Sequence, residues 1–174
     1  SESSHVGDGF LADTCSDWEQ AMSDFNLPDV KQTAIRIGIV LGKEGGALPI
    51  LTTLAKAFIG GSAGSGRQYM SWIHVRDLAR MLVWAMEEGI EGPVNAVAPN
   101  PVTNSEFMGV LRTVYGRPPV PSAPSAILRL ASGLMGKEST VILTGARVYP
   151  VIAHARGFEF EFERLEEALA DLAR

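Results

Sequence analysis

The stretch Gly64-Ser65-Gly66-Arg67-Gln68-Tyr69-Met70-Ser71-Trp72-Ile73-His74-Val75-Arg76-Asp77-Leu78-Ala79 changes its hydrophobic period within a few residues. After a glycine-rich turn, the apolar and aromatic residues between Tyr69 and Val75 predict a short buried strand. Asp77 then falls in the first turn of a helix, where a negative charge complements the helix dipole. One face of that helix is apolar, at Leu78, Met81, Leu82, Ala85 and Met86.

The rest of the chain alternates between strand and helix patterns joined by short loops, which is typical of an α/β sheet with parallel strands. Residues 31–41 are rich in isoleucine and predict a strand buried on both faces. Thr103 and Glu106 form a capping-box pattern that predicts a helix start at Asn104. Cys15 has apolar neighbours on a helix, and we expect it in the core rather than as a nucleophile. Helices are predicted over 10–25, 47–59, 104–115, 125–134, 139–147 and 165–172, and further strands over 94–98 and 158–162.

The junction Trp72-Ile73-His74-Val75-Arg76-Asp77-Leu78 resembles the "(F/W)IH(V/I)xDL" junction of the extended short-chain dehydrogenase/reductases, the nucleotide-sugar epimerase class. With the glycine-rich turn before it and the stretch from Gly92 to Phe107 after it, the resemblance narrows to an "epimerase family" subgroup once labelled as cell-division inhibitors. Three tail motifs fit the same subgroup: Gly145 to Pro150, Gly157 to Phe162, and Leu165 to Leu169.

The resemblance implies a fold class and a division into domains. We expect an α/β chain that forms the C-terminal strands and substrate subdomain of a Rossmann-like, doubly wound parallel sheet. We also expect a small, mainly helical C-terminal module of unassigned role. The proline-rich stretch after Arg117 suggests residues 1–117 for the epimerase-like part and 118–174 for the module. Because the sequence starts without Met, we expect a fragment or a processed product whose N-terminal part lies elsewhere.

Two motifs of the family are absent from the sequence. A dinucleotide-binding turn such as Gly-x-x-Gly-x-x-Gly is missing, because the glycine-rich stretch 60–66 follows a helix and precedes a strand. A Tyr-x-x-x-Lys pair is missing too: the opening helix resembles the one that carries it, and its lysine position falls near Thr14 or Cys15. We therefore expect an NAD(P)-dependent oxidoreductase or epimerase-like protein, of which this chain is the substrate side and inactive alone. The alternative is a non-catalytic protein that senses cofactor or binds a partner.

The resemblance also implies cofactor contacts along the strand 36–42. In the family, the end of this strand passes the nicotinamide and contacts it through backbone and apolar side chains. The corresponding residues are Arg36, Gly38, Ile39 and Val40, and Gly38 permits a close approach. The cofactor is expected to be NADP or NAD, and the alternative for the strand is a plain core role.

Substrate contacts are expected at the turn and strand of the opening stretch. Arg67 is a candidate for an anion contact, since a guanidinium can hold a phosphate or carboxylate through two parallel hydrogen bonds. Gln68, Trp72 and His74 would line the same cleft. The alternatives are a surface arginine bound to nothing and a histidine satisfied by the backbone. A catalytic pair of His74 and Asp77 is a further alternative.

Composition restricts the classes of partner. The net charge of -5 leaves no excess of cations for nucleic acid or an anionic membrane. One cysteine excludes an internal disulfide, and three well-separated histidines give no metal-ligand spacing. No run reaches the roughly twenty apolar residues of a membrane span. We therefore expect a cytoplasmic protein with a small-molecule substrate, no metal, and the missing N-terminal part of the same fold as its structural partner.

Overall fold

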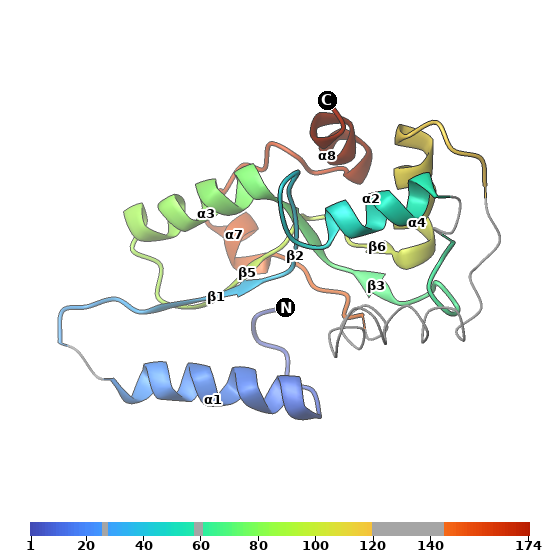
Figure 1. Cartoon of the computed structure of the whole chain (residues 1–174). Coiled ribbons are helices and arrows are strands. Elements are labelled where there is room, and N and C mark those ends of the chain that lie inside the picture. The colour runs from blue at the N-terminus through green and yellow to red at the C-terminus, as the bar shows by residue number, and fades with distance from the viewer. Residues whose placement is uncertain (26–27, 58–60, 120–144) are drawn as a thin grey trace.

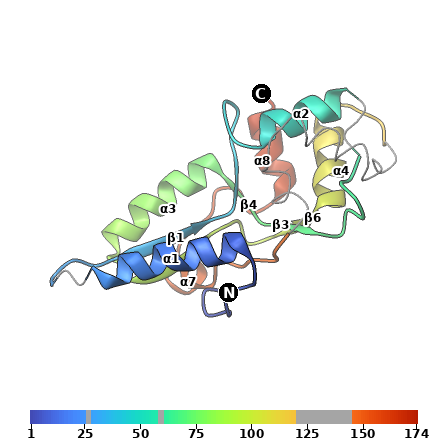
Figure 2. The ribbon, with the colours of Figure 1, turned by 60° about the horizontal axis from the view of Figure 1, so that its bottom comes forward.

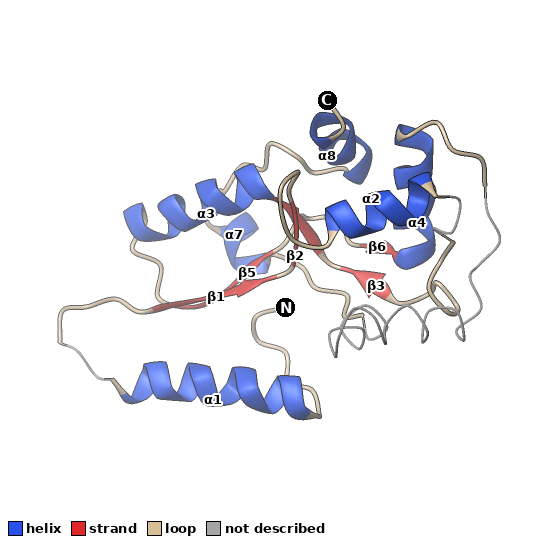
Figure 3. Ribbon diagram, viewed as in Figure 1, coloured by secondary structure: helices blue, strands red, loops and turns tan. Residues whose placement is uncertain are grey.

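The computed structural model of the chain describes residues 1–25, 28–57, 61–119 and 145–174. Helices and strands alternate as predicted (Figures 1 and 3). The elements are α1 (Phe10–Asp24), β1 (Thr33–Ile37), β2 (Ile39–Leu41), α2 (Leu48–Lys56), β3 (Tyr69–Met70), β4 (Trp72–His74), α3 (Val75–Glu87), β5 (Gly92–Ala96), β6 (Val102–Thr103), α4 (Asn104–Val114), α7 (Val151–Ala155) and α8 (Leu165–Leu172).

The strands form three pairs, two of them parallel. β1 runs parallel to β5, from Thr33 opposite Gly92 to Ile37 opposite Ala96. β2 runs parallel to β4, and the short β3 and β6 are antiparallel. Parallel pairs separated by helices confirm the predicted α/β class.

Gly38 divides the predicted strand 31–41 into β1 and β2, which pair with different neighbours. The Gly38 N–H donates to the Ala96 carbonyl (3.1 Å), whereas the next N–H, of Ile39, donates to the Ser71 carbonyl (2.8 Å). A Cβ at position 38 would lie 2.5 Å from the Ser71 carbonyl oxygen, so only glycine allows this approach. The prediction that both faces are buried is wrong, because Ile37 is 52% exposed.

Two clusters of buried side chains form the core. The first joins β2 and β4 to α2, α4 and α8, with Trp72 and Phe107 fully enclosed. The second joins α3, β5 and α7 around Ile73 and Met81. Side chains of this size each contribute roughly 1.5–3 kcal/mol when buried. Successive residues of β4 therefore point into different cores, which fixes the orientation of its end.

The capping box and the last helix match the sequence closely. The Glu106 N–H donates to the Thr103 hydroxyl (3.3 Å), and the Thr103 N–H donates to the Glu106 carboxylate (2.7 Å), so α4 begins at Asn104 as predicted. α8 occupies the predicted range and buries its apolar face. The predicted helix 125–134 and most of 139–147 lie outside the described residues, and residues 145–147 are not helical.

The predicted strand 158–162 does not form, although its alternation is correct. Phe158 and Phe162 are buried, and Glu159 and Glu161 are exposed. The reason is a side chain: the N–H groups of Glu161 and Phe162 donate to the Asp77 carboxylate rather than to a neighbouring strand. These two backbone N–H groups are thus satisfied without pairing to a neighbouring strand.

The placement of Cys15 in the core is wrong. α1 has no buried residue, and the Cys15 side chain is exposed. Figures 1 and 2 show α1 on the side of β1 and β5 opposite α3. A bidentate ion pair between Glu19 of α1 and Arg36 of β1 (2.7 Å for both contacts) holds the helix in this position. Phe10 and Trp18 remain 81% and 71% exposed. In the described residues nothing covers this apolar face, so Cys15 has no core to enter.

Candidate functional site

The junction between β4 and α3 is held by its own histidine. His74 is the N-cap of α3, and its Nδ1 accepts a hydrogen bond from the Arg76 N–H (3.1 Å). Its ring stacks on Phe162 with 3.9 Å between ring centroids. Because Nδ1 is the acceptor, Nε2 carries the proton of the neutral ring. His74 is thus satisfied by the backbone at one nitrogen, as one of the alternatives predicted.

The other nitrogen of His74 faces the end of the chain rather than Asp77. Nε2 is fully buried and has no hydrogen-bond partner among the described residues, and the Asp171 carboxylate on α8 lies 3.5 Å from it. Burial lowers the pKa of His74, and the Arg76 charge lowers it further. Asp77 turns away to the tail, so the structure contradicts the alternative of a His74–Asp77 catalytic pair.

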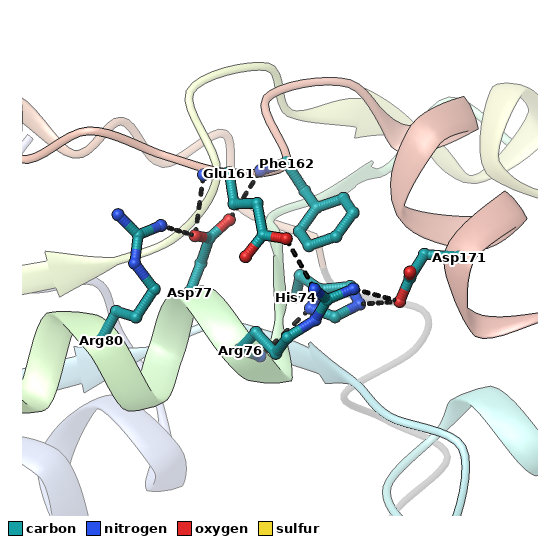
Figure 4. Close-up of polar contacts among 7 residues, drawn as sticks. All are labelled: His74, Arg76, Asp77, Arg80, Glu161, Phe162 and Asp171. Atoms are coloured by element: carbon teal, nitrogen blue, oxygen red, sulfur yellow. Dashed lines mark hydrogen bonds and ion pairs between the residues drawn. The ribbon is translucent and has the colours of Figure 1, made fainter.

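Asp77 is fully buried at the start of α3 and serves as an acceptor for the tail (Figure 4). Its two carboxylate oxygens accept the N–H groups of Glu161 and Phe162, both at 2.9 Å, and the Arg80 guanidinium adds a contact of 2.8 Å. Its place in the first helical turn is as predicted. The partners could not be predicted, because they lie 84 and 85 residues away in sequence.

Arg76 completes the attachment of the tail to the junction. Its guanidinium contacts Glu161 and Asp171, each at 2.6 Å, and it stacks over the Phe162 ring (Figure 4). The hydrogen bond from Arg76 lowers the pKa of Asp171. A groove of about 440 Å³ lies beside this cluster, between the loop 42–46, the start of α3 and the end of α8. The cluster is therefore a charged wall of that groove.

The four predicted cofactor residues lie together along β1 and β2, but their side chains differ in availability. The Arg36 guanidinium is occupied by Glu19 and by the Glu2 carbonyl (3.1 Å). Gly38, Ile39 and Val40 present backbone and apolar surface, and Val40 also lines the groove. In this arrangement the Arg36 guanidinium is not free to bind a cofactor, because its charge is already neutralised.

The four predicted substrate residues separate into two groups. Arg67 is exposed, and Gln68 is half-buried with its side chain donating to the Ala63 carbonyl (3.0 Å). Trp72 is fully enclosed, and its indole N–H donates to the Asn100 carbonyl (3.2 Å). His74 is enclosed as well. Trp72 therefore lines no cleft in this structure, because a core position leaves its ring no face for a ligand.

Sequence reasoning missed Asp171 and Glu161, which stand at the junction with His74. Both belong to the tail, whose motifs indicated a family but no chemistry. Among the described residues no group of acidic, histidine or cysteine side chains could hold a metal ion. Within that same part of the chain, no helix is long and apolar enough to cross a membrane.

Comparisons with known proteins agree with this architecture. A family model described as a domain of unknown function, DUF1731, matches residues 123–172. The chain is 40% identical over 169 residues to the Epimerase family protein SDR39U1 homolog, chloroplastic, of Arabidopsis thaliana, covering 97% of this chain and 48% of that protein. It is 37% identical over 172 residues to the Epimerase family protein YfhF of Bacillus subtilis, covering 98% and 55%.

Solved structures give the same result. The crystal structure of human epimerase family protein SDR39U1 (isoform2) with NADPH superposes with a TM-score of 0.87 at 33% identity, covering 99% of this chain and 58% of that one. A UDP-glucose 4-epimerase of Thermus thermophilus, in complex with NAD, has a TM-score of 0.64 at 16% identity, covering 92% and 52%, and shows likeness of fold alone. The chain spans about half the length of the curated relatives it matches. It belongs to the epimerase family of the SDR39U1 and YfhF kind, within the extended short-chain dehydrogenase/reductases, and carries the DUF1731 C-terminal domain.

Proposed function

We propose that this chain forms the substrate side of an NAD(P)-dependent oxidoreductase or epimerase-like protein that acts on a small molecule. The observation that carries the proposal is the superposition, over nearly the whole chain, on a relative crystallised with NADPH. The sequence holds neither the glycine turn nor the Tyr-x-x-x-Lys pair. The pyrophosphate site would therefore come from the remaining length of the protein, which we propose as the structural partner of this chain.

The proposed cofactor contacts are the backbone and apolar surface of Gly38, Ile39 and Val40. The missing Cβ at Gly38 lets its backbone lie against the Ser71 carbonyl and the Val97 side chain, which fixes the course of the chain from β1 into β2. Arg36 acts there by fastening α1 through Glu19, rather than by binding the cofactor with its guanidinium. The proposed cofactor is NADP or NAD. The choice between the two depends on residues that follow an earlier strand of the fold.

The proposed substrate contacts are the side chains of Arg67 and Gln68, beside the glycine turn. Arg67 is exposed and carries a guanidinium suited to a carboxylate or phosphate. Trp72 and His74 support these contacts from inside the core by fixing β4.

Two further parts of the proposal concern location and domain division. We propose that the protein is cytoplasmic and that the tail module begins at residue 118, after the epimerase-like part of residues 1–117.

Calorimetry tests the proposal in two steps. The 174-residue chain should bind NADPH weakly or not at all, whereas the intact protein should bind it. In the intact protein, Arg67→Ala should weaken substrate or anion binding and leave thermal stability nearly unchanged, while Arg156→Ala, an exposed control, should change neither. Tight NADPH binding by the chain alone, or equal effects of the two variants, would refute the assignment.

A second candidate function is a non-catalytic protein that senses cofactor or binds a partner. The absence of Tyr-x-x-x-Lys and the exposed apolar face of α1 favour it. Turnover of NADPH with a panel of carbonyl compounds by the intact protein separates the two candidates, because a sensor binds the cofactor without consuming it. Among the described strands β1 pairs only with β5, and light scattering on the chain tests whether its second edge and the α1 face drive self-association.

A further inference from the structure

A second arginine, Arg147 in the tail, lies within cation–π distance of two tyrosine rings. Its guanidinium carbon lies 5.0 Å from the centroid of the Tyr69 ring and 5.2 Å from that of Tyr149. Tyr69 belongs to β3, while Tyr149 precedes α7, so the three side chains come from two distant parts of the sequence. A guanidinium at this distance from aromatic faces is attracted by the ring quadrupoles.

The backbone on both sides of Arg147 is fixed by one serine. The Ser71 hydroxyl, between β3 and β4, donates to the Ala146 carbonyl (2.7 Å) and accepts from the Val148 N–H (3.0 Å). A Cβ at Gly145 would overlap the backbone of Tyr69, so glycine is required for the segment to lie this close to β3. The Tyr149 carbonyl accepts from the Asn95 side chain (3.0 Å). Arg147 is therefore presented from a segment with little backbone freedom.

The Arg147 guanidinium also differs from those of Arg36 and Arg76 in its hydrogen-bond and ion-pair partners. Arg36 and Arg76 are neutralised by carboxylates at 2.6 or 2.7 Å. Among the described residues, the Arg147 side chain contacts the two rings and makes no hydrogen bond or ion pair. Its side-chain N–H groups therefore have no acceptor within the described part of the chain, and its exposed position makes them accessible to a ligand.

We propose that Arg147, held by Tyr69 and Tyr149, is an anion-binding site for the phosphate group of a small molecule. The two rings limit the rotation of a side chain that otherwise has high rotamer entropy, so less freedom is lost on binding. The planar fork then meets two phosphate oxygens through parallel N–H···O bonds. The proposal does not depend on the oxidoreductase function, because the site consists of residues that this chain carries itself.

Isothermal titration of the 174-residue chain with inorganic pyrophosphate at low ionic strength tests the proposal. Arg147→Gln removes the guanidinium, and Arg156→Gln removes the same charge from an exposed position just after α7. We expect Arg147→Gln to weaken pyrophosphate binding about tenfold or more, the size of one charge-assisted contact, and Arg156→Gln to change it by less than about twofold. Arg147→Lys keeps the charge but loses the fork, and should also weaken binding.

Tyr149→Leu removes one ring and leaves Arg147 in place, so it should weaken binding by about threefold. If circular dichroism shows that Arg147→Gln does not fold, Arg147→Lys and Tyr149→Leu carry the test. Equal losses in Arg147→Gln and Arg156→Gln would overturn the proposal, since only net charge would then matter. The absence of saturable pyrophosphate binding by the unmodified chain would overturn it as well. Neither result bears on NADPH binding by the intact protein.

Discussion

Replacing Asp77 should release the tail from the strand–helix junction. In Asp77→Ala, the N–H groups of Glu161 and Phe162 both lose their acceptor, as does the Arg80 guanidinium. A buried donor left unsatisfied costs about 1–3 kcal/mol. The Phe162 N–H is buried and incurs this cost in full, whereas Glu161 and Arg80 are partly exposed and can turn to water. We therefore expect a loss of about 2–4 kcal/mol in the free energy of unfolding.

The Asp77→Asn variant removes the negative charge but keeps one side-chain oxygen as a hydrogen-bond acceptor, so it distinguishes the contribution of the charge from that of the acceptor. The amide keeps one oxygen for one N–H but turns an NH2 toward the other, so we expect a loss of about 1–3 kcal/mol. Urea unfolding followed by tryptophan fluorescence measures both variants, with Glu87→Gln on the exposed end of the same helix as the control for lost charge. Amide hydrogen exchange should speed up first at Phe162 and along α8. A loss within about 0.5 kcal/mol of the control for both variants would refute this account of the junction.

Three further predictions concern single side chains. The lowered pKa of His74 means that the unfolded chain takes up a proton first, so stability should be full above about pH 6.5 and fall below it by at most about 1.4 kcal/mol per pH unit; the His74→Gln variant should lack this slope in urea midpoints measured across that range. Cys15 is exposed, so a thiol reagent should modify it in the folded chain nearly as fast as in urea; strong protection would show that α1 is covered. Thr103→Ala should cost about 1 kcal/mol of stability through loss of the α4 cap, and Thr103→Ser should recover most of it in the same urea assay.

Local patterns predicted the elements well where the residues that decide them are close in sequence. The Thr103–Glu106 box begins α4, and the apolar spacing from Leu165 fixed both the range and the buried face of α8. The break at Gly38 was not predicted, because β1 and β2 differ only in which neighbouring strand accepts their hydrogen bonds. The exposure of Cys15 was not predicted either, since an amphipathic helix has the same pattern whether or not its partner is present.

The candidate site shows the same limit. The sequence placed His74 and Asp77 at a strand–helix junction, but assigned them to each other or to the local backbone. In the structure, their distant partners are Asp171 and the backbone of Glu161 and Phe162, all from the tail. Arg147 was not singled out either, because one of its two ring partners, Tyr69, belongs to β3 and is distant in sequence.

The described part of the tail, residues 145–174, contributes side chains to both hydrophobic cores. Phe162, Leu165 and Leu169 belong to the first core with Trp72, and Phe158 belongs to the second. The tail therefore packs on both sides of β4. Its acidic side chains Glu161 and Asp171 contact Arg76 at the start of α3. Because an interface with buried apolar contacts and a buried hydrogen bond from the Phe162 N–H resists separation, residues 145–174 should unfold together with β4 rather than as an independent unit.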